Sequence, residues 1–512
     1  MKKFYSIGLL LAGMASFAQA GSLDATFGTG GQVITSINTG ADKAFGVALQ
    51  ADGKIVVAGM TTNATTGKDF AVVRYNWNGS LDTTFGTGGI VTTDVQLGSE
   101  DEANSIAIQA DGKIVLAGYS DDGSQKKGAL VRYNTDGSLD TSFNTTGKVV
   151  TSFEGTTQAC NISVVKIHAL TGNIIVGGNT MTTTTKAKPV VARYTSAGVL
   201  DTTFNTTGIR LMWLNNLDQQ YLMNVEDLTV QTNGKITAVG WRDFPSQPWS
   251  NNGWAGRINA NGTMDTTFDT DGANDFNGSF NGNDKIFSMF LKSDNTIVAA
   301  GSSDISAQNY AFTIFEIAST GALGASANQE AVSFNALHTS MAYRVQQDVS
   351  GRFVMAGSTG NTTTRSFALS RINADYTIDN TFDADGKVTT NFSANAMSEA
   401  FDMTIQTDNR ILAVGYTGND FALARYLSGN DLAAQQVKTS KIALYPNPAN
   451  SVISFNDVDA KLAGSTFAIY NTVGQKVLSG AFNGSIAVSE LGQGVYYVKF
   501  DNVAETFNFV KK

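Results

Sequence analysis

The chain has 512 residues, 35 basic against 44 acidic, and a formal net charge of −9. This acidic balance argues against binding to nucleic acid or anionic lipid, because both depend on Lys and Arg contacts to phosphate. The single cysteine, Cys160, excludes an internal disulfide, so the fold relies on its hydrophobic core. Cys160 opens the apolar run CNISVVKI, which predicts a small buried hydrophobe there and not a reactive thiol.

Residues 1–20 have the parts of a secretory signal peptide. Lys2 and Lys3 precede an apolar stretch, and Ala18-Gln19-Ala20 is a small-residue cleavage site. The apolar stretch is shorter than the roughly 20 residues of a membrane-spanning helix, and no later window reaches that length. We therefore expect export to the periplasm, cleavage after Ala20 and a mature protein with no transmembrane segment.

Residues 21–430 repeat one unit, seen whole at residues 44–93. Its first run, FGVALQ, alternates apolar and polar residues and reads as a strand, and an Asp-Gly or Asn-Gly dipeptide then turns the chain into KIVVAG. A third run, DFAVVRYN, leads through SLDTTFGTGG to a fourth, GIVTTDV. A lone sheet of four antiparallel strands would expose an apolar face. The copies must therefore stack, and radial stacking gives a β-propeller.

The two ends of the repeat region are complementary fragments of one unit. Residues 22–36 match the end of a unit, residues 398–430 match its beginning, and six whole units lie between them. The sequence thus predicts an all-β, seven-bladed β-propeller closed by the N-terminal strand. The alternative, an open β-solenoid, would need polar capping units at both ends.

The segments ALQADGKIVVAG, DFALARY and GSLDTTFGTGG resemble the delta-60 repeat family of secreted bacterial proteins, over roughly residues 22 to 430. The resemblance supports the propeller fold. It assigns no chemistry to any residue.

The second unit places residues 132 to 140 in the spacing of a calcium loop, but Arg132 occupies the first ligand position. A guanidinium there satisfies Asp140 in place of a cation, so we expect no metal in this loop. Instead we predict that one Arg-carboxylate pair per blade pins the connection between third and fourth strands, shielded by a following phenylalanine (Phe85, Phe143, Phe204, Phe268). The alternative is that both residues are solvated. The predicted pairs are Arg74–Asp82, Arg132–Asp140, Arg193–Asp201, Arg257–Asp265, Arg371–Asp379 and Arg425–Asp24.

The fifth unit lacks both members of the pair, with Glu316 at the Arg position and Gly324 at the Asp position. Joint loss within one chain favours direct contact between the two positions. This unit also has Ala327 where the others have phenylalanine, so we expect its connection to be the loosest.

The period ends in a polar linker, residues 431–440, and a different pattern fills residues 441–512. Runs of alternating apolar and polar residues between tight turns predict a small C-terminal β-sandwich. YPNPA, IYNTVGQKV and GVYYVKF resemble the C-terminal sorting domain of the type IX secretion system. The resemblance implies handling by that machinery in a Bacteroidota-like cell, and a protein that is secreted or held at the outer cell surface. The alternative is a carbohydrate-binding sandwich.

No motif in the sequence indicates catalysis. The two histidines, His168 and His338, lie in no metal-ligand spacing, and there is no nucleophile elbow, zinc-binding helix or phosphate loop. We predict no catalytic residue, no metal and no cofactor. Paired carboxylates for glycoside chemistry remain possible, because sequence cannot show their separation.

Four tryptophans fall within 42 residues, next to an arginine and an aspartate. Indole faces beside charged groups suit stacking on sugar rings or an aromatic peptide. The alternative is a long loop that buries its own aromatics. The predicted ligand-binding residues are Trp213, Trp241, Arg242, Asp243, Trp249 and Trp254. The sequence therefore predicts a binding or adhesion module for extracellular glycan or protein, with a propeller hydrolase or lyase acting on extracellular polysaccharide as the alternative.

Overall fold

Every regular element in the described part of the computed structural model is a β-strand. The all-β class is as predicted. The chain divides into two compact units, Met1–Asp431 and Leu432–Lys512. The structure describes residues 19–155, 159–183, 186–212, 222–243, 251–276, 283–306, 309–325, 328–335, 338–393, 396–429, 444–445, 447–455, 465–471, 475–501 and 503–512.

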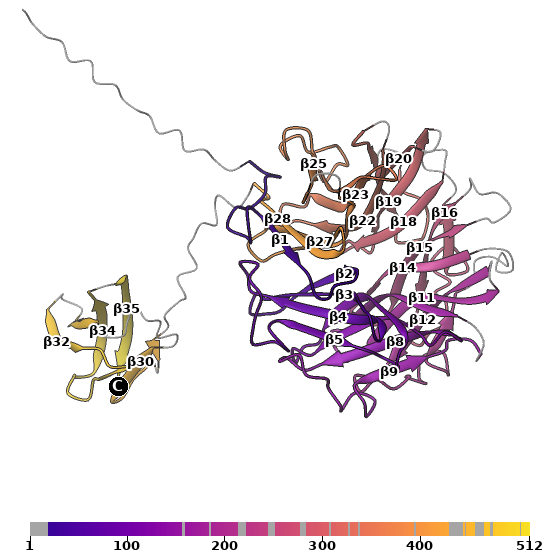
Figure 1. The fold of residues 1–512 in the computed structure, drawn as a ribbon. Coiled ribbons are helices and arrows are strands. Elements are labelled where there is room, and N and C mark those ends of the chain that lie inside the picture. Colours follow the sequence, from indigo (N-terminus) through magenta and orange to yellow (C-terminus); the bar gives the residue numbers. More distant parts are fainter. Residues whose placement is uncertain are drawn as a thin grey trace, which may run out of the picture. The chain divides into compact units, whose positions relative to one another are not determined.

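The first unit is a propeller whose blades each have four antiparallel strands (Figure 1). A parallel pairing, Ala187 opposite Leu222, joins the sheets of blades 3 and 4. Blade 1 holds β2 (Asp42–Leu49), β3 (Ile55–Asn63), β4 (Gly67–Tyr75) and β5 (Ile90–Thr93). Blade 2 holds β6 (Glu100–Ile108), β7 (Ile114–Asp121), β8 (Lys126–Tyr133) and β9 (Lys148–Thr151). Blade 3 holds β10 (Cys160–Ile167), β11 (Ile174–Thr183), β12 (Lys186–Tyr194) and β13 (Ile209–Leu211). Blade 4 holds β14 (Leu222–Val230), β15 (Ile236–Asp243), β16 (Asn252–Ile258) and β17 (Ala273–Phe276).

The remaining blades follow the same plan. Blade 5 holds β18 (Asp284–Leu291), β19 (Ile297–Ser306), β20 (Asn309–Ile317) and β21 (Gln329–Val332). Blade 6 holds β22 (Thr339–Gln347), β23 (Phe353–Gly360), β24 (Arg365–Ile372) and β25 (Lys387–Thr390). Blade 7 holds β26 (Ser398–Ile405), β27 (Ile411–Thr417) and β28 (Asp420–Tyr426), and its fourth strand is β1 (Gln32–Thr35).

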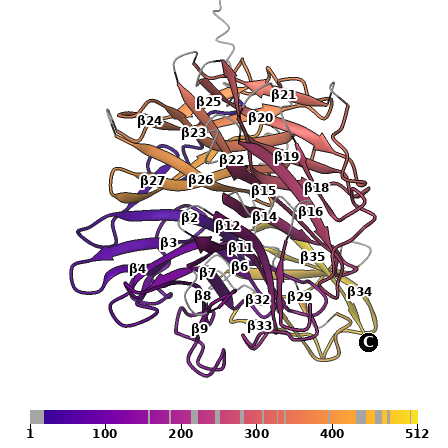
Figure 2. The same ribbon diagram turned by 90° about the vertical axis from the view of Figure 1, so that its right-hand side faces the viewer.

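Strand β1 joins the two ends of the propeller. It pairs antiparallel with β28, with Gln32 opposite Ala424 and Thr35 opposite Phe421. The first strand of each blade packs against the first strand of the next, and β26 packs against β2 (Figure 2). Between blades 7 and 1 the buried side chains of Leu412, Leu423 and Val57 belong to one hydrophobic cluster. The first strands therefore lie innermost, and the fourth strands lie at the rim.

A β-bulge interrupts every first strand at the same place. In blade 1 the register shifts between Ala44 and Gly46, and in blade 7 it shifts between Ala400 and Asp402. A bulge leaves one residue unpaired and re-aims its side chain. The bulge residues, in blade order, are Phe45, Asn104, Ser163, Glu226, Phe287, Tyr343 and Phe401.

The second unit consists of two sheets around one core. One sheet runs β29 (Leu444–Tyr445), β30 (Val452–Phe455) and β33 (Ser485–Ala487), and the other runs β32 (Lys476–Ala481), β31 (Thr466–Asn471), β34 (Gly494–Phe500) and β35 (Val503–Lys511). Buried side chains of both sheets share one cluster, in which the ring of Phe455 lies 5.2 Å from that of Phe500. This is the arrangement of a small β-sandwich.

Candidate functional site

The bulge residues line a cavity of about 310 Å³ among the innermost strands. Its walls come from the first strand of every blade, so residues far apart in the sequence meet there. The lining residues are Phe45, Val47, Asn104, Ser105, Ile106, Asn161, Ser163, Val164, Lys166, Asn224, Glu226, Phe287, Tyr343, Arg344, Phe401 and Asp402.

One side of the cavity is a continuous aromatic wall. The ring centroids of Phe45 and Phe401 lie 5.1 Å apart, as do those of Phe401 and Tyr343, and those of Tyr343 and Phe287. All four side chains are half-buried. The wall therefore offers apolar ring surface to a ligand in the cavity.

The opposite side is polar and internally hydrogen-bonded. Asn224 Nδ2 donates to Ser163 Oγ at 3.1 Å and to Glu226 Oε1 at 2.9 Å. Asn104 Nδ2 donates to Asn161 Oδ1 at 3.0 Å. Glu226 Oε2 has no hydrogen-bond donor among the described residues, and burial raises the pKa of Glu226. The amide groups of Asn104 and Asn224 each donate to two protein acceptors, so this side offers a polar ligand chiefly acceptor oxygens such as Glu226 Oε2.

A group of charged residues in and beside the cavity links different blades. Arg344 Nη1 lies 3.1 Å from Asp227 Oδ2, and Arg344 Nε lies 3.0 Å from Asp402 Oδ1. Lys166 Nζ lies 3.6 Å from Asp227 Oδ1. Burial opposes ionisation of Asp227, but the charges of Lys166 and Arg344 outweigh it and lower the pKa of this carboxyl. In Asp402 burial dominates and raises the pKa.

The carboxylates of this group also accept backbone hydrogen bonds from neighbouring blades. Asp402 Oδ2 accepts from the amide of Val47 at 2.9 Å, which links blade 7 to blade 1. Asp227 Oδ2 accepts from the amide of Met289 at 3.1 Å, which links blade 4 to blade 5. These oxygens are thus occupied by structural partners.

The structure separates the predicted tryptophan cluster. Trp241 is half-buried, its Nε1 donates to Glu226 Oε1 at 2.6 Å, and Lys285 Nζ lies 4.2 Å from its ring centroid, so Trp241 adjoins the cavity. Trp254 is fully buried and donates through Nε1 to the backbone oxygen of Asn224 at 3.1 Å. Trp254 is therefore a core residue, and the prediction that it contacts a ligand is wrong. Trp213 and Trp249 lie outside the described residues.

The two charged residues of that cluster also have different surroundings. Arg242 is buried and forms an ion pair with Asp275 of β17. Asp243 is half-buried, and its negative charge opposes the lowering of the Lys285 pKa by burial. The guanidinium of Arg242 thus serves an ion pair within blade 4 and is not exposed to a ligand.

The predicted Arg-Asp pairs all have the geometry of close ion pairs. The distance from Arg Nε to Asp Oδ2 is 2.7 Å for Arg74–Asp82, Arg132–Asp140 and Arg371–Asp379, 2.8 Å for Arg193–Asp201 and Arg425–Asp24, and 2.6 Å for Arg257–Asp265. Each guanidinium also lies over a phenylalanine ring, as Arg132 does over Phe143 at 4.5 Å.

Each of these arginines also reaches the next blade. Arg257 Nη1 donates to the backbone oxygen of Ser319 in blade 5 at 2.7 Å, and Arg425 Nη1 donates to that of Trp77 in blade 1 at 2.6 Å. Arg132 contacts the backbone oxygen of Ser196 in blade 3 in the same way. The arginine therefore ties its own third-to-fourth connection to the neighbouring blade, a role that the sequence did not indicate.

In blade 5 the charges of the pair are exchanged: a carboxylate, Glu316, stands at the arginine position, and a lysine, Lys292, is its partner. Glu316 Oε1 accepts a hydrogen bond from Lys292, and Glu316 Oε2 accepts one from Asn328. Blade 6 has Tyr376 where the other blades carry glycine, and this side chain is buried against Phe353 with ring centroids 5.8 Å apart. Glu316 is thus not left without a partner. Ala327 lies outside the described residues.

Sequence reasoning missed the cavity residues because a bulge breaks the alternation that assigns side chains to faces. One signal was present. One position in the first run of each repeat differs in side-chain type between copies, although the residues around it recur. It is aromatic in Phe45, an amide in Asn104 and a carboxylate in Glu226. A position that varies inside a fixed frame marks a place where packing does not dictate the residue.

Two family models match the chain. The DUF5122 beta-propeller, a domain of unknown function, matches residues 50–85, 109–143 and 171–204. The secretion system C-terminal sorting domain matches residues 443–512. The chain carries DUF5122 propeller repeats and a type IX sorting domain. The sorting domain indicates secretion or export to the cell surface, and no helix in the described residues is long and apolar enough to cross a bilayer.

Three of the solved structures to which the chain is similar are distant from it in sequence. The extracellular domain of the hybrid two component system BT3049 from B. thetaiotaomicron is 11% identical, with a TM-score of 0.38, over 93% of this chain and 56% of that one. Polysaccharide lyase Uly1 is 9% identical, with a TM-score of 0.44, over 77% and 91% of the two chains. Virginiamycin B lyase from Staphylococcus aureus, in a catalytically inactive form with quinupristin, is 10% identical, with a TM-score of 0.41, over 77% and 99%. No curated protein matches the sequence. The assignment of the two domains thus comes from the family models.

Proposed function

We propose that this exported propeller is a binding module that takes part of an extracellular glycan into the cavity among its innermost strands. The observation that carries the proposal is the division of the cavity into an aromatic wall and a polar wall. A sugar ring has an apolar face of C–H groups and an edge of hydroxyl groups. The wall from Phe45 to Phe287 suits the face, and Asn104 and Glu226 suit the hydroxyls.

The size of the cavity supports a short segment of glycan. Ligand cavities typically measure about 300 to 1,000 Å³, and this one is about 310 Å³. One or two sugar rings fit such a volume. Trp241, which hydrogen-bonds Glu226 beside the cavity, can extend the aromatic surface toward further rings.

The state of the carboxylates favours binding over catalysis. Asp227 and Asp402 are held by Arg344 and by backbone amides, so neither is free to transfer a proton. Glu226 is the one cavity carboxylate in the described residues with an oxygen that lacks a protein donor, and glycoside hydrolysis commonly uses two carboxylates. A polysaccharide hydrolase or lyase therefore has weaker support than a binding module.

A glycan array with the mature chain tests the proposal. Phe401→Ala removes the centre of the aromatic wall, and Glu226→Gln removes the charge but keeps the shape. We expect each to weaken binding of the best glycan by about tenfold, which equals about 1.4 kcal/mol. Leu170→Ser, at an exposed position in the turn between β10 and β11, is the control and should leave binding unchanged.

If both cavity variants bind the glycan as tightly as the wild type does, the cavity is not the binding site. The same glycans should be assayed for chain cleavage. Turnover by the wild type that is lost in Glu226→Gln would replace the binding proposal with the enzymatic alternative.

A further inference from the structure

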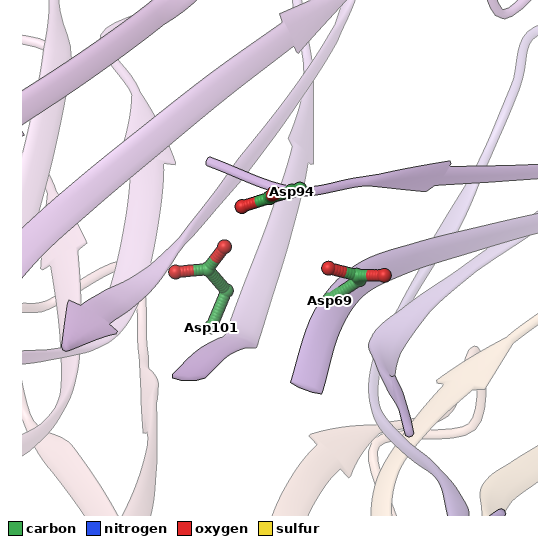
Figure 3. A group of neighbouring side chains, drawn as sticks. All are labelled: Asp69, Asp94 and Asp101. Carbon is green, nitrogen blue, oxygen red and sulfur yellow. The ribbon is translucent and has the colours of Figure 1, made fainter. Parts of the chain in front are cut away.

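Three aspartates converge at the junction of blades 1 and 2 (Figure 3). Asp69 begins the buried part of β4, Asp94 follows β5, and Asp101 lies near the start of β6. One carboxylate oxygen from each lies within 4.8 Å of the other two. Asp69 and Asp101 are buried, with exposed fractions of 3% and 0%, and Asp94 is half-buried.

The protein satisfies Asp101 but not the other two carboxylates. Asp101 accepts from Ser99 Oγ at 2.6 Å and from the amide of Val95 at 2.6 Å. Asp69 Oδ1 and Asp94 Oδ1 are both inaccessible to solvent and have no hydrogen-bond donor within the described residues. Each of the two uses only its other oxygen: Asp69 Oδ2 accepts from Thr66 Oγ1 at 2.7 Å, and Asp94 Oδ2 accepts from the amide of Gly98 at 3.0 Å. Leaving a buried acceptor unpaired is costly, more so when it is charged. Two buried oxygens without a donor, on two members of one carboxylate cluster, therefore point to a missing positive partner.

No described side chain supplies that partner. Lys148 Nζ donates to the backbone oxygen of Asp94 at 2.6 Å, and the described residues contain no ion pair to any of the three carboxylates. Lys148 therefore lies near the cluster without forming an ion pair with any of its three carboxylates.

The repeat supplies an internal comparison. At the junction of blades 2 and 3 the equivalent positions hold Lys127, Ser152 and Cys160, and at the junction of blades 7 and 1 they hold Asp420, Ser36 and Asp42. Asp42 there is satisfied by Thr61 Oγ1 at 2.5 Å and by the amide of Ile37 at 2.7 Å. The propeller frame therefore does not require three aspartates at this place.

We propose that Asp69, Asp94 and Asp101 bind a calcium ion that ties blade 1 to blade 2. An all-oxygen, trianionic ligand set is typical of a hard divalent cation, and Ca²⁺ binds oxygen at about 2.3 to 2.6 Å. Two ligands of such an ion can be up to about 5 Å apart, which accommodates the 4.8 Å spread of these oxygens. Extracellular calcium modules bind with Kd values of about 10⁻⁴ to 10⁻³ M, and this chain is exported. The site is separate from the cavity and does not depend on the proposed function.

Isothermal titration of the chelator-treated mature chain with CaCl₂ tests the proposal. We expect one site per chain in the wild type and a loss of affinity of about tenfold or more in Asp69→Asn and in Asp94→Asn. Asp122→Asn is the control, because Asp122 is exposed in the β7–β8 turn and lies outside the cluster. It accepts from the amides of Ser124 and Gln125, which asparagine can also do, and from Lys127 Nζ at 3.4 Å at the surface.

Thermal unfolding gives a second readout. Calcium should raise the Tm of the wild type and of Asp122→Asn but not that of Asp69→Asn. Without calcium, Asp69→Asn should be at least as stable as the wild type, because it removes like-charge repulsion at a buried site. Absence of binding by the wild type at about 10 mM calcium, or unchanged affinity in both cluster variants, would overturn the proposal.

Discussion

Replacing Arg132 with alanine tests whether the Arg-Asp pairs hold the propeller together. The side chains of Arg132 and Asp140 are each 6% exposed, and Nε lies 2.7 Å from Oδ2. The variant loses this ion pair, the contact with the Phe143 ring and the hydrogen bond to the backbone of Ser196 in blade 3.

The expected loss follows from what remains around the carboxylate. Removing one member of a buried ion pair costs about 3 to 5 kcal/mol. Lys113 Nζ lies 2.9 Å from Asp140 Oδ2 and still compensates its charge, so we expect the lower end, about 3 kcal/mol. An unfolding entropy of about 2.1 cal/mol/K per residue over roughly 400 residues then gives a fall in Tm of about 3 to 4 °C.

Calorimetry of the mature chain at pH 7 measures this fall. Lys127→Ala is the matched control, because Lys127 pairs with Asp122 at the surface and its loss should cost less than about 1 kcal/mol. Arg193→Ala should lie between the two, since that pair is 15% and 13% exposed. A Tm for Arg132→Ala within about 1 °C of the wild type, or a control as damaging as Arg132→Ala, would refute the reasoning.

Two further predictions concern the same connections. Tyr376→Gly should lower the free energy of unfolding by about 2 to 3 kcal/mol. The cavity left beside Phe353 costs more than is gained by placing glycine at a φ of 67°. The control is Asn295→Gly, at an exposed position with a φ of 66°, which should be neutral or slightly stabilising in the same melting experiment. An equal loss of stability in both variants would contradict the packing argument. In an acid titration followed by circular dichroism, the pair carboxylates should keep their contribution above pH 4 and lose it as the pH falls further. Burial opposes ionisation of Asp24, Asp201 and Asp379, but hydrogen bonds and the arginine charges lower each pKa below the value of about 3.9 in an unfolded chain, so their stabilisation is present above that value. A loss of structure centred between pH 7 and 5 would contradict this.

The strands of each repeat could be predicted because the same pattern recurs along the sequence. Four runs per copy, a hairpin dipeptide and an arginine eight residues before an aspartate are all local patterns, and their recurrence gives strand order and pairing. The substitution of Glu316 and Gly324 even indicated which two positions touch. It could not show that Lys292 is the partner of Glu316, because the contact depends on packing between strands.

Sequence alone therefore determined the class of fold and the presence of the sorting domain, since the first depends on periodicity and the second on a contiguous motif. The tertiary structure decided which side chains share a cavity. Phe45, Glu226 and Phe401 lie on three strands far apart in the chain, and the bulge that turns each side chain inward has no signature in local alternation. Likewise, Asp69 and Asp101 meet only because two blades pack together, and no pattern within one copy records what its neighbour contributes.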